Sequence, residues 1–141
     1  MRVAVLMGGT SDERDVSLSS GAEVADALRE AGHEVVAVDT THGLLSREEE
    51  ARLLSGGVDA APPGASDLAR LDERHTVALT RDPSLHDIEV FFLALHGGPG
   101  EDATLQALLD AARVTYTGSD CPGSPLAMDK DCLLSTFVAV V

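Results

Sequence analysis

The first forty residues have the pattern of a strand, a helix and a second strand. Arg2 to Met7 and Glu34 to Asp39 are short apolar runs, and the first of them ends at two glycines. Apolar residues at helical spacing lie between the two runs, and Gly32 follows where a left-handed residue would end a helix. Two strands joined by a helix in so short a segment indicate a βαβ unit. The sequence therefore predicts an α/β fold with a mostly parallel sheet.

The start of this first helix is open, because three residues are suitable caps. Asp15, Ser17 and Ser20 can each accept a hydrogen bond from the first turn, and Ser20 with Glu23 forms a capping-box pattern. The helix is expected between Asp15 and Ala31.

A second transition from strand to helix occupies residues 88 to 112. Ile88 to Leu95 is the most hydrophobic segment of the chain, and a helix with one apolar face is expected from about Asp102 to Ala112. In open α/β sheets, ligands bind beyond the carboxyl ends of the strands. The loop that begins at His96 therefore marks a candidate site, and the loop after Met7 should face the same crevice.

Residues 40 to 87 are interpreted as a variable insert within one domain. Ser46 with Glu49 predicts a capping box and a short acidic helix through Leu54. Glycine and proline clusters follow, and His75 to Thr80 is a candidate edge strand. The domain is expected to cover residues 1–131, and residues 132–141 form an apolar tail without charge.

Composition excludes several classes of function. Ten basic residues against twenty-four acidic ones give a formal net charge of −14, which argues against binding of nucleic acid. Two cysteines indicate neither a disulfide framework nor a metal cluster, and the histidine spacing predicts no zinc site. No signal-peptide or membrane-span pattern is present, so a cytoplasmic location with reduced thiols is expected.

The loop from Gly8 to Ser17 lacks the patterns of the common nucleotide-binding loops. No third glycine completes a dinucleotide fingerprint, and no Gly-Lys-Ser/Thr ending completes a P-loop. Gly8 and Gly9 permit a tight turn and the close approach of a ligand. Glu13 can grip a cationic group such as an ammonium there, or belong to a solvated charge cluster. Arg14 can brace that carboxylate or face solvent.

The second loop offers His96, Glu101 and Asp102. His96 ends a strand and precedes a glycine, so it is well placed to exchange a proton in a crevice, although a lone histidine also serves structural roles. Asp102 has the position of a helix N-cap, and Glu101 can complement the same helix terminus.

These segments resemble the signature motifs of D-alanine–D-alanine ligases. Residues 8–17 are similar to the family's first motif, Gly-Gly-x-Ser-x-Glu-x-Glu-Val-Ser. Residues 96–106 are similar to the second, His-Gly-x-x-Gly-Glu-Asp-Gly-x-x-Gln. Residues 116–119 (Tyr-Thr-Gly-Ser) and 127–130 (Ala-Met-Asp-Lys) resemble the next two landmarks in the same order. The resemblance covers residues 1 to about 131.

The resemblance implies a Rossmann-like, three-layer domain of the type that precedes an ATP-grasp domain. It also implies an enzyme of peptidoglycan precursor synthesis that uses ATP and Mg²⁺ (or Mn²⁺) to activate one D-alanine as an acyl phosphate. The amine of a second D-alanine then attacks. The family commonly forms homodimers through this domain, so a homodimer is expected. Whether the second substrate is D-alanine, D-lactate or D-serine stays open.

The resemblance also assigns roles to individual residues. Glu13 would anchor the ammonium of the first D-alanine, and His96 would lie beside the carboxylate of that substrate. Val16 would shape the pocket for the methyl group, and Lys130 would reach the ATP phosphates. Two further motif positions, Ser17 and Gly97, would also contact the substrate. Other motif residues would shape the two loops: Gly8, Gly9, Gly100, Glu101 and Asp102.

Two features depart from the family pattern. Ala103 replaces a glycine, which would be tolerated if this residue occupies the first helical turn. The chain ends at Val141, before the central and ATP-grasp domains, so neither ATP nor the metal would be held fully by it and no turnover is expected from it alone. The alternatives are a truncated, inactive protein that acts through self-association or small-molecule binding, and an unrelated small-molecule-binding module of Rossmann-like fold.

Overall fold

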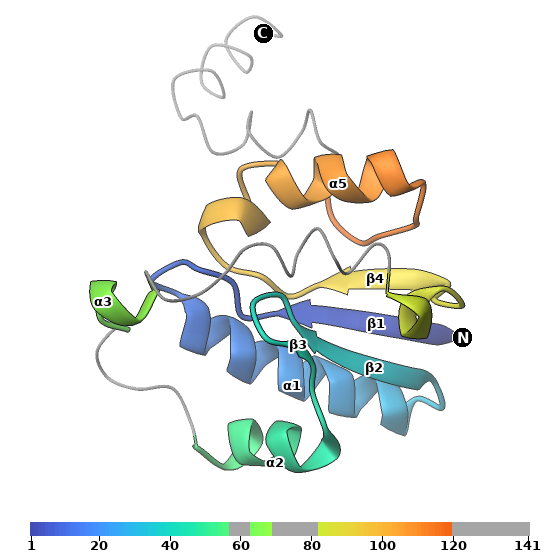
Figure 1. The fold of residues 1–141 in the computed structure, drawn as a ribbon. Helices are drawn as coiled ribbons and strands as arrows, with labels where there is room; N and C mark the ends of the chain where they lie inside the picture. The colour runs from blue at the N-terminus through green and yellow to red at the C-terminus, as the bar shows by residue number, and fades with distance from the viewer. Residues whose placement is uncertain (57–62, 69–81, 120–141) are drawn as a thin grey trace, which may run out of the picture.

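The computed structural model describes residues 1–56, 63–68 and 82–119, which form one sheet with helices on both faces (Figure 1). The strand order is β3-β2-β1-β4. The strands are β1 (Arg2–Met7), β2 (Glu34–Asp39), β3 (Gly43–Leu44) and β4 (Val90–Leu93). Strand β1 pairs in parallel with β2 and β4, whereas β3 is antiparallel to β2. The expected α/β fold with a mostly parallel sheet is confirmed.

The central strand β1 is covered on both faces. All its residues from Val3 to Met7 are at most 5% exposed. Ala4 and Leu6 belong to the core beneath one helical layer, and Val5 and Met7 belong to the core beneath the other. A strand buried on both faces needs apolar residues at every position, which is why β1 shows a continuous apolar run and no alternation.

Helix α1 (Arg14–Glu30) covers the face that carries Val5 and Met7. It begins after Glu13 without a side-chain cap, so the expected caps and the expected capping box at Ser20 were wrong. The helix ends as predicted. Gly32 has a φ of +86°, its amide donates to the Arg29 carbonyl, and the His33 amide donates to Leu28, which together form a Schellman motif.

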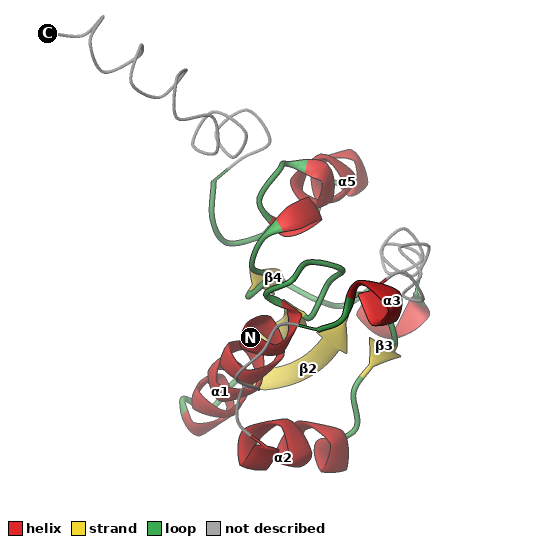
Figure 2. Ribbon diagram, turned by 90° about the vertical axis from the view of Figure 1, so that its left-hand side faces the viewer, coloured by secondary structure: helices red, strands yellow, loops and turns green. Residues whose placement is uncertain are grey.

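Helix α2 (Arg47–Gly56) lies on the same side of the sheet as α1 (Figure 2). Its predicted capping box is confirmed: the Ser46 amide donates to Glu49 at 2.7 Å, and the Glu49 amide donates to the Ser46 hydroxyl at 3.3 Å. Glu50 is 3% exposed and receives two hydrogen bonds from Arg29 of α1. A buried ion pair thus fastens α2 to α1. The short helix α3 (Ala65–Leu68) follows.

Helix α5 (Thr104–Ala112) covers the opposite face and buries Leu105 and Leu109. It starts two residues later than expected. Its N-cap is Ala103, whose φ of +75° is left-handed, while Asp102 accepts a hydrogen bond from the Thr104 amide at 2.9 Å. Asp102 is therefore not the N-cap, and Ala103 is not in the first helical turn. A left-handed φ explains why the family motif has glycine at this position.

Several expectations lie outside the described residues. They are the edge strand at 75–80, the motif at 127–130 with Lys130, both cysteines and the tail at 132–141. Within the part of the chain that is described, no helix is long and apolar enough to cross a membrane.

Candidate functional site

The loops that follow β1 and β4 are joined at the carboxyl edge of the sheet. The Ser11 hydroxyl in the first loop donates to the His96 carbonyl in the second at 2.5 Å. The Ser17 hydroxyl donates to the Ala94 carbonyl and accepts from the Gly8 amide, both at 2.8 Å. The bonds to the His96 and Ala94 carbonyls cross between two distant chain segments, so they fix the position of one loop relative to the other.

Glycines allow this close approach. A Cβ atom on Gly97 would lie 3.1 Å from the Ser11 side chain. One on Gly8, whose φ is +84°, would lie 2.7 Å from an oxygen of Asp39. A larger residue at either position would push the loops apart.

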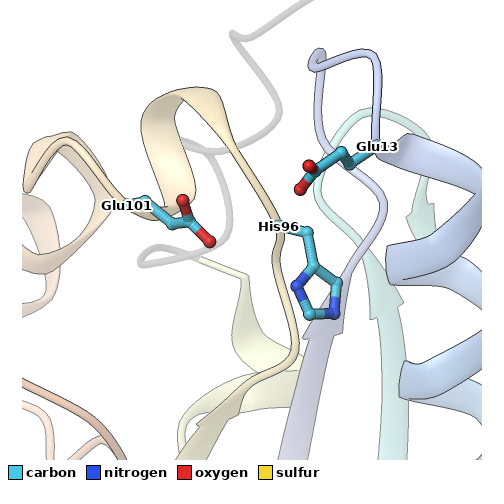
Figure 3. A group of neighbouring side chains, drawn as sticks. All are labelled: Glu13, His96 and Glu101. Atoms are coloured by element: carbon cyan, nitrogen blue, oxygen red, sulfur yellow. The ribbon is translucent and has the colours of Figure 1, made fainter. Parts of the chain in front are cut away.

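The joined loops bring Glu13, His96 and Glu101 together (Figure 3). One side-chain oxygen or nitrogen atom from each residue lies within 4.8 Å of the corresponding atoms of the other two. Glu13 is exposed at the start of α1, whereas His96 and Glu101 are half-buried. Figure 3 shows both carboxylates above the ring of the histidine, with that of Glu101 displaced to one side. We call these three residues the acceptor cluster.

The acceptor cluster carries two carboxylates beside one histidine. Within residues 1–56, 63–68 and 82–119, no lysine or arginine forms an ion pair with Glu13 or Glu101. Two carboxylates so close together repel each other unless a cation lies between them. The cluster is therefore suited to a cationic group, either an organic ammonium or a metal ion.

Arg14 neither braces Glu13 nor faces solvent. Its guanidinium forms an ion pair with Asp39 at the end of β2 and donates to the Gly9 carbonyl at 3.0 Å. It also donates to the Thr41 hydroxyl at 3.0 Å and lies 3.2 Å from His42 Nδ1. The side chains of Arg14 and Asp39 are only 11% and 4% exposed. This buried pair holds the first loop against the end of β2.

The same contacts set the ionisation of Asp39. Burial alone would raise the pKa of this carboxyl. Hydrogen bonds from Arg14 and Thr41, with the positive charge of Arg14, outweigh the burial and hold the pKa of Asp39 below its usual value.

Comparison with known proteins shows which family the chain belongs to. A family model described as the D-ala D-ala ligase N-terminus matches residues 2–119. The chain belongs to the D-alanine–D-alanine ligase family. A D-alanine–D-alanine ligase of Halalkalibacterium halodurans is 38% identical over 130 residues, which are 92% of this chain and 31% of that relative. One from Anaeromyxobacter dehalogenans is 41% identical over 96% of this chain and 33% of the relative.

Solved structures of the ligase family have the same fold. The Bacillus anthracis D-alanine–D-alanine ligase superposes with a TM-score of 0.59 at 28% identity, covering 96% of this chain and 33% of that one. The Coxiella burnetii ligase superposes with a TM-score of 0.66 at 23% identity, and the match covers 99% of this chain and 42% of that one. The chain therefore spans about a third of the length of the ligases it matches.

The other family positions among the described residues differ in exposure and contacts. Ser17 is completely buried, and its hydroxyl joins the two loops, so it has no surface to offer a substrate. Val16 is 42% exposed in the first turn of α1. Gly97 lies beside both Ser11 and Glu13. The carbonyl of Gly100 accepts a hydrogen bond from buried Gln106 at 2.8 Å, which anchors the turn before Glu101.

The described residues do not fit a nucleoside triphosphate. The Gly8 amide is occupied by Ser17, so it is not free to bind a phosphate. The acceptor cluster presents carboxylates, which repel phosphates. We therefore assign no step of nucleotide chemistry to these residues.

Sequence reasoning missed three contributors to the site. Glu101 was expected to complement a helix terminus, but it faces Glu13 and His96. Ser20 was considered only as one of three candidate caps of α1, but its hydroxyl lies 3.2 Å from His96 Nε2. Asp39 was considered only as the end of a strand. Its position, an acid at the carboxyl end of a parallel strand, could have marked it.

Proposed function

We propose that this chain is the N-terminal part of an ATP-dependent D-alanine–D-alanine ligase and that its acceptor cluster binds the ammonium group of the first D-alanine. The observation that carries the proposal is the pair of carboxylates with which no lysine or arginine of the described residues forms an ion pair, placed where the family motifs meet. An amino acid substrate supplies the missing cation.

The chain's own residues would bind and orient this substrate. Glu13 and Glu101 accept hydrogen bonds from the ammonium, and their charges neutralise it. Because the loops are fixed to each other through Ser11 and Ser17, little conformational freedom is lost on binding. The substrate's carboxylate is held away from the two acids, toward the parts of the enzyme that would activate it.

The remaining features of the family assignment stay predictions. They are the use of ATP with Mg²⁺ or Mn²⁺, the acyl-phosphate step, the role in peptidoglycan synthesis, the homodimer and the cytoplasmic location. The 141-residue chain alone should release no phosphate from ATP in the presence of D-alanine, because the residues described here do not fit the nucleotide.

Binding is tested by nuclear magnetic resonance titration of the chain with D-alanine. We expect saturable shifts at Glu13, His96 and Glu101, and we expect Glu13→Gln to weaken the affinity by about tenfold or more, the loss of one charged hydrogen bond. Asp12→Asn is the matched control, because Asp12 is an exposed neighbouring acid outside the cluster.

A second ligand distinguishes binding of the ammonium group from binding of the rest of the D-alanine molecule. N-acetyl-D-alanine keeps the methyl group and the carboxylate but has no ammonium, so it should not bind at the cluster. The proposal is wrong if the acetylated compound binds equally well, or if Glu13→Gln keeps the wild-type affinity for D-alanine.

A further inference from the structure

Ser20 connects helix α1 to the ring of His96. Its hydroxyl donates to the Val16 carbonyl at 2.8 Å, in the manner of serines inside helices, and lies 3.2 Å from His96 Nε2. A serine hydroxyl has a single proton. When that proton is given to Val16, the oxygen can only accept a hydrogen bond from the ring.

This arrangement decides which nitrogen of a neutral His96 carries the proton. A neutral imidazole has one N–H group and one nitrogen with a free lone pair. If Nε2 donates to Ser20, then Nδ1 has the lone pair. In Figure 3 one ring nitrogen lies on the side of α1, and the other, Nδ1, lies on the side of Glu101.

The acceptor cluster would then offer three acceptors, one from each residue. An ammonium group has three N–H donors. Three acceptors at hydrogen-bond distance from a tetrahedral ammonium lie about 4.6 Å apart. The three acceptor atoms of the cluster lie within 4.8 Å of one another. A small divalent metal ion would draw its ligands to about 3 Å from one another. The limit of 4.8 Å includes the spacing that an ammonium group needs.

We propose that Ser20 is a positioning residue that holds neutral His96 in its Nε2–H form, so that Nδ1 joins Glu13 and Glu101 as the third acceptor for an ammonium group. The identity of the ligand rests on the function proposed above, whereas the tautomer of His96 does not. The consequence differs from the family resemblance. A neutral Nδ1 repels a carboxylate, so His96 in this form binds the amino end of the substrate.

The form of the ring is measured on the full chain labelled with ¹⁵N-histidine. Long-range ¹H–¹⁵N spectra at about pH 8.5, two units above the usual imidazole pKa of about 6.5, distinguish a protonated from an unprotonated nitrogen. His96→Gln identifies the signals. We expect a protonated Nε2 and an unprotonated Nδ1 in the wild type, and a mixture of both forms in Ser20→Ala.

Two variants serve as controls. Ser19→Ala makes the same change one residue away on α1 and should keep the wild-type form. Ser20→Thr keeps a hydroxyl and should restore it. The proposal is overturned if the wild-type ring is protonated at Nδ1, or if Ser20→Ala has the same spectrum as the wild type.

Affinity for D-alanine supplies the second measurement. Ser20→Ala should weaken it by about three- to tenfold, the value of one hydrogen bond, and Ser20→Thr should recover it. If the wild type does not bind D-alanine, the proposed function fails and the ammonium part of this proposal fails with it. If D-alanine binds equally well to Ser20→Ala, only this proposal fails. If Zn²⁺ alone shifts Nδ1, the cluster is a metal site and the ammonium assignment is overturned.

Discussion

Single side chains hold the candidate site in place, and Arg14 and Asp39 do so as a buried ion pair. The pair joins the loop after β1 to the end of β2, and Arg14 is the first residue of α1, directly after Glu13. Loss of either charge would leave the other buried without its partner. The direction of the Glu13 backbone therefore depends on a contact that does not touch the acceptor cluster.

Replacement of Asp39 by asparagine tests the strength of this pair. At about pH 7 the variant should lose about 3 kcal/mol of unfolding free energy, because Arg14 is left buried and unpaired. The folded-state pKa of Asp39 is below its unfolded value, so the stabilisation is complete above about pH 4 and is lost as the pH falls through the folded pKa.

Urea denaturation between pH 7 and pH 2 measures both effects. The difference in unfolding free energy between the wild type and Asp39→Asn should decrease steadily as the pH falls below about 4. Asp12→Asn, at an exposed position, should differ from the wild type by less than about 0.5 kcal/mol. A gap that stays constant with pH would contradict the assigned role.

Ala103 and Arg113 are the two non-glycine residues of the described ranges with a positive φ, and Ala103 is the buried one. A left-handed alanine costs about 1–2 kcal/mol, and the loss of its buried methyl group costs about 0.8 kcal/mol. Ala103→Gly should therefore raise the unfolding free energy by up to about 1 kcal/mol. Ala107→Gly, at an exposed position in the middle of α5, should lower it by about 1 kcal/mol. Equal destabilisation by both variants, measured by thermal unfolding, would show that Ala103 is not strained.

At the scale of elements, the packing of α1 on β1 requires a glycine. A Cβ atom on Gly21 would lie 2.6 Å from the Cβ of Met7, closer than such atoms approach. Gly21→Ala should lower the unfolding free energy by about 1–3 kcal/mol through overpacking, although alanine is the better helix former. Gly56→Ala is the control at the end of α2, where a Cβ atom would meet no atom of the described residues within 4 Å, and it should be neutral or stabilising. A stable Gly21→Ala protein would mean that α1 lies farther from β1.

Elements with long apolar runs could be predicted from the sequence. Strands β1 and β2 have the predicted ends, because burial imposes apolar residues along nearly their whole lengths. Strand β3 was missed because two residues are too few to show a pattern. The starts of α1 and α5 were missed because their first residues are set by loop contacts, such as the one between Asp102 and Thr104, and not by periodicity.

The candidate site divides in the same way. Glu13 and His96 were found because each follows a strand whose end the sequence marks with glycine. Glu101 follows a turn that Gln106 anchors through the Gly100 carbonyl, and Arg14 meets Asp39 from a position 25 residues away. Contacts of this kind depend on the folded chain, so no local pattern indicates them.

At the scale of the whole molecule, the described residues form a scaffold that places the acceptor cluster at one edge of the sheet (Figures 1 and 3). The chain spans about a third of the ligases it matches. We propose that this third supplies the binding site for the ammonium group of the first substrate in a working ligase.

A chimera tests that claim most directly. Residues 1–119 replace the matching segment of the Halalkalibacterium halodurans ligase, and D-alanine-dependent phosphate release from ATP is measured. We expect an active chimera in which Glu13→Gln raises the KM for D-alanine by about tenfold or more and leaves the KM for ATP unchanged, while Asp12→Asn changes neither. An active chimera with the same KM for D-alanine after Glu13→Gln would contradict the claim.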